Sequence, residues 1–300
     1  MHKPRIALIG AGKVGSTFGI LLRQKGYEIS AVTSKTRSHA ASLAARVDSI
    51  VTDDATTCAS SAEVVFVTTP DREIAKVARE VASNKGFRRG QVVIHASGFL
   101  PSEALSVARE FGAHVASMHP LQSFADVEAA LVALPGSLMA IEGDEEAIQV
   151  AKALAMDMDT KPFVISTSAK PLYHAAAVVA SNYLVSLIHF SVSIYRGLGL
   201  SERDALQALW PLIEGTVKNI RQVGPTQALT GPIARGDSEV VKGHLEALSK
   251  VGKENVALYS VLGLYTVRLA EEKGAITRDQ AQELREALER MDLHERRFRL

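Results

Sequence analysis

The stretch that decides the fold is Ile6-Ala7-Leu8-Ile9-Gly10-Ala11-Gly12-Lys13-Val14-Gly15. Its apolar start predicts a buried strand, and the following run, residues 16–24, has the composition of a helix. In the G-x-G-x-x-G pattern between them, Gly10 permits a tight turn, Gly12 lets the backbone approach a diphosphate, and Gly15 lets the helix pack closely on the strand. We therefore predict a dinucleotide site at Gly10, Gly12, Lys13, Val14 and Gly15, with the amides of the helix N-terminus facing the anion. The alternative is an ordinary strand-turn-helix.

The residues after the second expected strand, Tyr27–Thr33, indicate which dinucleotide fits this turn. In an NAD site, an Asp or Glu usually ends this strand and binds the ribose hydroxyls. Here the chain continues Ser34-Lys35-Thr36-Arg37, which contains no acid and two cations. Ammonium and guanidinium groups make charge-assisted hydrogen bonds to phosphate. The sequence therefore predicts NADP, bound by Ser34, Lys35 and Arg37. A solvated, basic start of the next helix is the alternative.

Length and composition are typical of an enzyme with two domains. The 300 residues exceed the usual size of one domain, and 47% hydrophobic residues can fill sizeable cores. A formal charge of +1 argues against a nucleic-acid partner. The single cysteine, Cys58, excludes an intramolecular disulfide and a multi-cysteine metal site, and we expect no metal.

The stretch Ala175–Tyr195 contains no Lys, Arg, Asp or Glu and is long enough to span a bilayer. Its serines, Asn182 and His189 would be costly in lipid, so we expect no membrane span. We expect instead a helix that is buried by neighbouring helices or by a second subunit. Because no signal-peptide pattern precedes the first strand, the expected location is the cytoplasm.

The chain changes character near its middle. Strand signals alternate with helical stretches at 5–9, 27–33, 63–68, 91–96, 114–118, 137–141 and 161–165. Such alternation predicts a doubly wound parallel sheet of the Rossmann type. From residue 168 onward only helices are expected, at 169–197, 201–223, 238–250, 253–273 and 277–296. We therefore predict an α/β dinucleotide-binding domain at 1–166, followed by an all-α domain at 167–300.

In doubly wound sheets the ligand lies beyond the carboxyl ends of the strands, so residues just after each strand are candidates for the site. Thr68, Thr69 and Pro70 form a small polar turn that can pass close to a ribose of the cofactor. His95 and His119 end two later strands, where a substrate could reach the nicotinamide, although each could equally be structural. The turn at His119 resembles the His-Pro turn of prephenate dehydrogenases, in which that histidine contacts the substrate. We therefore predict that His119, of the two histidines, contributes to the catalytic site.

A second group of polar residues lies on the first helix of the all-α half. At about 100° per residue, Lys170, His174 and Ser181 share one stripe, and Asn182 lies beside it. Polar groups on an apolar helix need partners, and reduction of a carbonyl needs a proton donor. We predict that these four residues face the substrate. A polar network with neighbouring helices or a second subunit is the alternative.

The segment Leu229–Asp237 is predicted to be an ordered loop between helices. Pro232 suits a first helical turn and Asp237 suits an N-cap. Thr230 and Arg235 lack such a structural reason, and a guanidinium can hold a carboxylate in a bidentate pair. We predict that both bind the substrate.

Together these motifs resemble one family along nearly the full length: Rossmann-type NADP oxidoreductases with a helical C-terminal domain of unknown function. The motifs are GAGKVG, Met118–Leu121, Tyr173–Ala177 with Ser181–Tyr183, and Leu229–Pro232 with Arg235–Asp237. The wider superfamily includes ketopantoate reductases and β-hydroxyacid dehydrogenases, which carry Lys followed four residues later by Asn on the first interdomain helix. Here Lys170 is followed by His174. The resemblance implies that Lys170 or His174 is the proton donor and that His174 or Asn182 holds the carbonyl oxygen.

The superfamily also includes pyrroline-carboxylate reductases, which interlock helices between subunits, so the resemblance implies a homodimer formed through the C-terminal helices. Our leading expectation is an NADPH-dependent reductase of a small oxo acid or related carbonyl, with ketopantoate-like compounds as the first candidates. A cyclic imine reductase is the second hypothesis. A non-catalytic NADP-binding dimer that reports redox state is the third.

Overall fold

The computed structural model describes residues 3–296, with side chains as far as Glu289. The chain divides into two compact units, residues 1–183 and 184–300. The predicted boundary at residue 166 follows the last strand, whereas the first unit continues through the next helix. It does so because Lys170 and Tyr173 of that helix hydrogen-bond to residues of the sheet and its loops.

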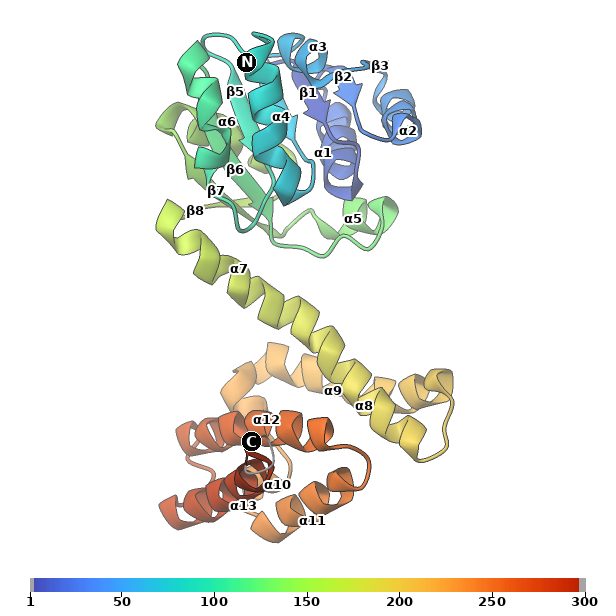
Figure 1. The fold of residues 1–300 in the computed structure, drawn as a ribbon, viewed down its shortest axis with the longest axis vertical. Helices are drawn as coiled ribbons and strands as arrows, with labels where there is room; N and C mark the ends of the chain where they lie inside the picture. The colour runs from blue at the N-terminus through green and yellow to red at the C-terminus, as the bar shows by residue number, and fades with distance from the viewer. Residues whose placement is uncertain (1–2, 297–300) are drawn as a thin grey trace. The chain divides into compact units, whose positions relative to one another are not determined.

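The first unit is an α/β domain on a mostly parallel sheet (Figure 1). In the described residues the sheet has eight strands, in the order β3-β2-β1-β4-β5-β6-β7-β8. They are β1 (Ile6–Ile9), β2 (Ile29–Thr33), β3 (Ile50–Val51), β4 (Val64–Val67), β5 (Val92–His95), β6 (His114–Pro120), β7 (Leu138–Gly143) and β8 (Lys161–Val164). The predicted doubly wound sheet is confirmed.

Two details of the sheet differ from the prediction. Strand β3 has only two residues, too few to show an alternation in the sequence. Strand β7 pairs antiparallel with β6, so a sheet that is parallel throughout is wrong at this point. A parallel pair needs a crossover connection. The helix between these strands, α5 (Val127–Ala133), packs against the helix that follows β1 instead of crossing over the β6–β7 pair.

Helices cover both faces of the sheet. One face carries α1 (Lys13–Gln24), α2 (Arg37–Val47) and α6 (Glu145–Asp157), and the other carries α3 (Ala55–Ser60), α4 (Asp71–Ser83) and a 3-10 segment, η1 (Ser102–Phe111). In β1, Leu8 packs in the first layer and Ile9 in the second. Burial on both faces explains why the strands read as continuous apolar runs.

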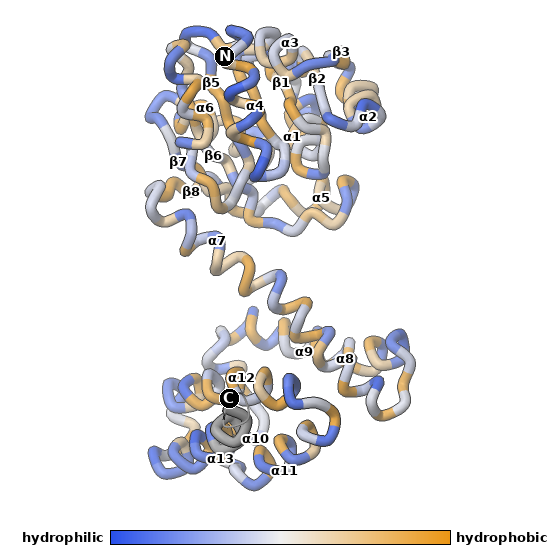
Figure 2. Tube along the Cα trace, in the orientation of Figure 1, coloured by the Kyte–Doolittle hydropathy of each residue, from blue (hydrophilic) through white to orange (hydrophobic). Residues whose placement is uncertain are grey.

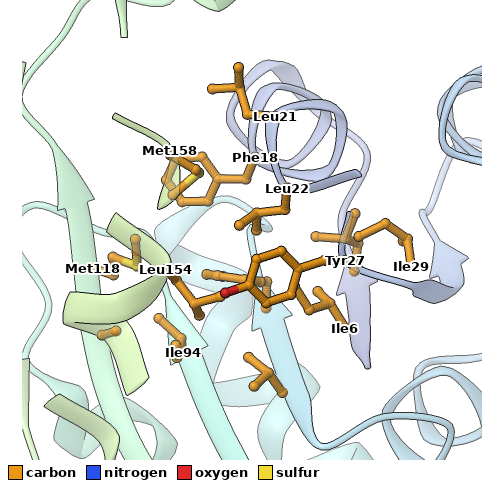
Figure 3. Close-up of a cluster of buried hydrophobic side chains, with 14 of the residues drawn as sticks. Ile6, Phe18, Leu21, Leu22, Tyr27, Ile29, Ile94, Met118, Leu154 and Met158 are labelled. Carbon is orange, nitrogen blue, oxygen red and sulfur yellow. The ribbon is translucent and has the colours of Figure 1, made fainter. Parts of the chain in front are cut away.

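The core between the sheet and α1, α2 and α6 is dense (Figure 3). Phe18 of α1, Met118 of β6 and Leu154 of α6 are among its buried members. The rings of Phe18 and Phe66 meet edge to face with centroids 5.6 Å apart, a favoured geometry for aromatic pairs. This packing fixes the first turn of α1 next to the ends of β1 and β4.

The chain's cysteine, Cys58, lies in the other core layer. Its Sγ donates to the backbone oxygen of Leu8 at 3.6 Å, and no part of the side chain reaches solvent. Burial raises the pKa of this thiol to about 12. Cys58 is therefore a packed thiol without the character of a nucleophile.

After β8, the elements of the described residues are all helical, as predicted. The first unit ends with a short 3-10 turn, η2 (Thr167–Ala169), α7 (Lys170–Val178) and a π-helix, η3 (Val179–Tyr183). The second unit contains α8 (Leu184–Gly197), α9 (Glu202–Ala228), α10 (Pro232–Arg235), α11 (Ser238–Ser249), α12 (Lys253–Glu272) and α13 (Arg278–Arg296). Leu245, Val267 and Leu284 form the centre of its main core.

The helical stretch Thr167–Gly197 is long and apolar enough to cross a membrane by length and composition. Helices of its own unit leave most of each part of this stretch exposed, so burial by neighbouring helices, one of the two expectations, holds only around Val192. In α7, η3 and α8 the buried side chains are Lys170 and Val192, whereas Leu172 is 79% exposed and Val185 is 67% exposed. Apolar residues recur along α8 and α9 (Figure 2). Part of this apolar surface is covered where α8 and α9 pack together around Val192 and Leu209, whereas Val185 and Leu212 stay exposed.

His95, at the end of β5, has a structural role. Its side chain is fully buried. Nδ1 accepts the amide N–H of Ser97 at 3.1 Å, so the proton lies on Nε2, which donates to the oxygen of Pro101 at 3.0 Å. Burial lowers the pKa of His95 to about 4. The geometry therefore favours a structural role for His95 over contact with a substrate.

The His95 environment predicts acid sensitivity. Because the folded pKa is about 4 and the ordinary value is 6.5, the unfolded chain binds the proton first, and stability is lost as the pH falls from 6.5 to 4. The loss is on the order of 3 kcal/mol. We expect His95→Gln to be less stable at neutral pH but to show a shallower decline in this window, measured by urea unfolding at a series of pH values. If the free energy of unfolding of the variant fell as steeply with pH as that of wild type, His95 would not be the cause of this dependence.

Candidate functional site

The glycine turn after β1 is closed by steric contact with β4. Gly10 has φ +113° and donates its N–H to the oxygen of Thr33 at 2.8 Å. A Cβ at Gly15 would lie 2.2 Å from the Gly10 oxygen and 2.3 Å from Thr68 Oγ1. By contrast, a Cβ at Gly12 would meet nothing within 4 Å. The lack of room for a Cβ at Gly15 shows how closely the turn packs against Thr68. The open space at Gly12 leaves the backbone accessible to a diphosphate.

The first turn of α1 is prepared for an anion. Its N-cap, Gly12, supplies no side-chain hydrogen bond, and no acidic residue lies in the first turn. The leading amides of a helix lack partners within the helix and carry the positive end of its dipole. A groove of about 430 Å³ borders this turn and is lined by basic Lys13, His39 and Arg46. The predicted residues Gly10, Gly12, Lys13, Val14 and Gly15 therefore form one turn, with Lys13 exposed beside it.

The segment after β2 is an exposed, basic turn. Thr33 is buried and its hydroxyl donates to the oxygen of Thr52 at 2.9 Å, which ties β2 to the end of β3. Lys35 and Arg37 are exposed. Arg37 pairs with Asp53, which follows β3. The acid that the sequence lacks after β2 thus comes from the neighbouring strand, and sequence spacing alone could not show this.

The end of β4 contributes a second wall. Thr68 donates its hydroxyl to the Gly10 oxygen at 2.7 Å, so it holds the glycine turn. Thr69 Oγ1 is buried and has no hydrogen-bond partner among the described residues, and Pro70 is the exposed N-cap of α4. A buried hydroxyl without a partner is costly unless a ligand or water completes it. The glycine turn, the helix amides and this hydroxyl together fit a dinucleotide.

Two histidines and a tyrosine meet beyond β6, in the same unit. The hydroxyl of Tyr173 lies 2.9 Å from Nδ1 of His119, and the rings of His119 and His174 have centroids 5.7 Å apart. Both imidazoles abut Gly98, where a Cβ would lie 2.5 Å from His174 Nδ1 and 2.8 Å from His119 Nε2. His174 Nδ1 is buried and unpaired in the part of the chain that the structure describes. We define His119, Tyr173 and His174 as the imidazole–phenol cluster.

The surroundings of His119 and Tyr173 favour the neutral form of each group. Burial, and then the neighbouring His174 and Lys170, lower the pKa of His119 to about 4. Burial raises the pKa of Tyr173 to about 12. At neutral pH the cluster therefore contains an uncharged imidazole hydrogen-bonded to a protonated phenol. Such a pair can donate or relay a proton without first acquiring charge.

Lys170 is bonded to the Ser97–Gly98 segment. It is 1% exposed, and its Nζ donates to the Ser97 oxygen at 2.9 Å and to Ser117 Oγ. Oε1 of Glu142 lies 4.0 Å from Nζ. Burial lowers the pKa of Lys170 to about 8, while Glu142 and Asp71 act in the opposite direction. Lys170 is thus a buried cation surrounded by acceptors of the protein itself.

Glu142 is an acid next to the end of an apolar strand, β7. It is 2% exposed and accepts the N–H of Ser102 at 2.7 Å. The hydroxyls of Ser102 and Thr167 each donate to it at 2.9 Å. These bonds connect β7 to the starts of η1 and η2 and give the carboxylate enough donors to stay buried.

Sequence reasoning missed three residues of this arrangement: Tyr173, Glu142 and Ser97. Ser97 Oγ donates to Asp71 at 2.7 Å and accepts the N–H of Leu100 at 2.9 Å, so it fixes the turn after β5. Glu142 had a usable signal, because a lone acid in a buried strand needs a cation. Tyr173 had none beyond its position next to His174.

The structure brings together only part of the predicted polar stripe. Lys170 bonds to the Ser97 oxygen, whereas His174 lies against Gly98 beside His119. Ser181 and Asn182 lie in η3, where both are exposed. The π-helix breaks the period of about 100° per residue on which the stripe depends.

The predicted substrate-binding loop belongs to the second unit. Pro232 is in the first turn of α10, and Asp237 is the N-cap of α11, as predicted. Arg235 Nε donates to Asp237 at 2.9 Å, and its side chain is largely exposed. Thr230 is exposed. The substrate-binding role of Thr230 and Arg235 stays a prediction.

Comparisons with known proteins agree with this architecture. Residues 1–120 match the Rossmann-like domain, and residues 137–266 match a domain of unknown function, DUF2520. A comparison with proteins of curated function gives no match. A solved structure of a protein from Thermotoga maritima is 31% identical, with a TM-score of 0.71, over 89% of this chain and 99% of that chain.

Two further solved structures show the same fold. One, from Bacteroides fragilis, is provisionally named an NADP oxidoreductase; it is 24% identical over 87% of this chain and 96% of that chain, with a TM-score of 0.72. The other is an imine reductase from a Pseudomonas species, 16% identical over 96% of this chain and 100% of that chain, with a TM-score of 0.63. The identity to the Thermotoga protein over nearly its whole length and the two matched domains show that this chain belongs to the family that joins a Rossmann-like domain to DUF2520.

Proposed function

We propose that the protein is an NADP-dependent oxidoreductase that reduces a small carbonyl or imine compound. One observation carries the proposal: the glycine turn and the imidazole–phenol cluster lie in one unit, at the carboxyl ends of β1 and β6, two parallel strands of one sheet with β4 and β5 between them. This edge is where doubly wound sheets bind their ligands. The provisional name of the Bacteroides structure is consistent with this cofactor.

The residues of this chain have distinct tasks in such a reaction. A bound nicotinamide supplies the hydride. The glycine turn would hold the diphosphate through the amides of α1. The buried Thr69 hydroxyl would form a hydrogen bond with the ligand. As the hydride reaches the carbon of a C=O group, the oxygen must gain a proton, and the imidazole–phenol cluster provides protonated Tyr173 next to neutral His119. The product is an alcohol.

A cyclic imine is the second candidate substrate, and one observation favours it. The cluster holds a histidine with a pKa of about 4 and a tyrosine with a pKa of about 12, both far from the value of a strong acid catalyst at neutral pH. An imine arrives already protonated and needs less help from the protein. Similarity in fold to an imine reductase agrees with this candidate. Ketopantoate-like oxo acids remain the first carbonyl compounds to test.

Cofactor preference tests the first part of the proposal. We expect NADPH to bind more tightly than NADH, measured by nicotinamide fluorescence. Arg37→Ala weakens NADPH by about tenfold and leaves NADH nearly unchanged, because the guanidinium makes charge-assisted hydrogen bonds only to the 2′-phosphate. Asp53→Asn has the opposite effect, because it frees Arg37 from a competing anion.

Gly15→Ala is the control for the site itself, since its Cβ would collide with the backbone of Gly10. It should weaken both nucleotides. Failure of the wild-type protein to bind either nucleotide would show that the glycine turn is only architectural. A clear preference for NADH would overturn the assignment of NADP.

Turnover tests the second part. In a panel of oxo acids and cyclic imines with NADPH, Tyr173→Phe should lower kcat on an oxo acid by about 10²–10⁴-fold, the usual contribution of a general acid. The same variant should affect a protonated imine much less. His244→Gln, which removes a histidine in the second unit that also contacts a tyrosine, is the matched control. Binding without turnover of any compound would favour the non-catalytic redox-reporting dimer.

We also propose that the apolar faces of α8 and α9 are covered by a second copy of the chain. Val185 in α8 and Leu212 in α9 are each about two-thirds exposed. An extended apolar surface of this kind marks an interaction site. A second copy is a better cover than lipid for a helix that carries His189 among its apolar residues, because an imidazole is costly to place in lipid.

Sedimentation tests this proposal. Wild-type protein should sediment as a dimer, and Val185→Glu or Leu212→Glu should shift it to monomer, since a carboxylate buried in an apolar interface is strongly unfavourable. Lys218→Glu, an exposed change on α9, should leave the dimer intact. A monomer at all concentrations, or protein recovered with membranes, would contradict the proposal.

A further inference from the structure

We propose that Lys170 and Glu142 are positioning residues: the Lys170 ammonium holds the Ser97–Gly98 peptide against the imidazole–phenol cluster and is not the proton donor. The catalytic consequence rests on the proposed function, whereas the geometry stands without it. The proposal separates Lys170 from His174, which the sequence left as alternative donors.

The first step concerns the three N–H bonds of the ammonium. Nζ donates to the Ser97 oxygen and to Ser117 Oγ, and the carboxylate of Glu142 lies 4.0 Å away. An ammonium has three donors and no acceptor. All three N–H bonds thus have an acceptor of the protein near them. Loss of a proton to a substrate would remove the charge that balances the Glu142 carboxylate inside a buried site.

The second step concerns the peptide that Lys170 holds. The Ser97 oxygen accepts from Lys170 and, at 3.2 Å, from Ser117 Oγ. The N–H of Ser97 donates to His95, and its hydroxyl donates to Asp71. Every polar atom of Ser97 is therefore bonded, and the position of the next residue is fixed with it.

The third step concerns Gly98. Its α-carbon faces His174 Nδ1 and His119 Nε2 so closely that a Cβ there would lie under 3.0 Å from both. A shift of the Ser97–Gly98 peptide therefore moves the surface on which both rings rest. Lys170 is bonded to the oxygen of this peptide, so it fixes the surface on which both rings rest.

The fourth step concerns Glu142. A buried ammonium without a counter-charge would be strongly unfavourable. Glu142 supplies the charge and is itself held by Ser102 and Thr167. Its role is to keep Lys170 charged and in place.

Amine labelling of the unaltered protein gives the first test. Reductive methylation with formaldehyde, followed by peptide mass spectrometry, compares Lys170 with Lys161, an exposed lysine of the same unit. A positioning lysine should react about 100-fold more slowly than Lys161, because it requires local opening. A proton donor must face the ligand, so labelling of the two lysines at similar rates would overturn the proposal.

Two substitutions give the second test. Lys170→Gln keeps N–H donors for the Ser97 oxygen but cannot act as an acid, whereas Lys170→Met removes the donors. We follow the imidazole nitrogens of His119 and His174 by long-range proton–nitrogen NMR across pH, without cofactor. At pH 7 the Gln variant should retain the wild-type signals and the Met variant should shift both, whereas both variants should raise the pKa of His119, because each removes the Lys170 charge that lowers it. Lys161→Met is the matched control. Imidazole signals in the Met variant that match wild type would overturn the proposal.

Turnover completes the test once a substrate is found. Lys170→Gln should retain activity within about tenfold of wild type, whereas loss of a general acid costs about 10²–10⁴-fold. A loss of that size, with imidazole signals unchanged, would identify Lys170 as the donor. Failure of the proposed function itself would appear elsewhere, as absence of nucleotide binding, and would leave the labelling and NMR results unaffected.

Discussion

The first unit depends on one steric constraint, the lack of room for a Cβ at Gly15. The backbone oxygen of Gly10 and the hydroxyl of Thr68 occupy that space. Helix α1 therefore lies directly against β1 and β4, and its amides emerge at the carboxyl edge of the sheet. The strands that follow are in register with β4 and deliver Ser97, Ser117 and His119 to the same edge. Close backbone packing, together with the hydrogen bond from Thr68 to Gly10, thus places the candidate chemistry.

Buried charge then fixes the details that packing leaves open. Interior ion pairs are weak evidence for stability, because desolvation offsets most of their attraction. The Lys170–Glu142 pair is better understood as a device that specifies one arrangement. It connects α7, β7 and the turn after β5, which are separated in the chain. Any other register of these elements would leave a buried charge without its partner.

The sequence allowed the sheet, the glycine turn and the order of the helices to be predicted, because these depend on local periodicity and on spacing within one turn. The antiparallel β7 was missed, since strand direction depends on where α5 packs. The stripe of Lys170, His174 and Ser181 assumed a regular helix, and a π-helix cannot be read from apolar residues. The pairing of Arg37 with Asp53, and of Lys170 with Glu142, joins separate strands and helices, so no local pattern could reveal either.

The buried thiol of Cys58 has a practical consequence. With a pKa of about 12, only about one molecule in ten thousand carries a thiolate at pH 8 in the folded state. Unfolding restores an ordinary thiol, so reactivity rises steeply when the layer containing α3 opens. Since the chain has one cysteine, the rate at which a thiol reagent modifies the protein measures how often that layer opens. Nucleotide binding at the glycine turn should lower this rate, and no engineered label is needed to follow it.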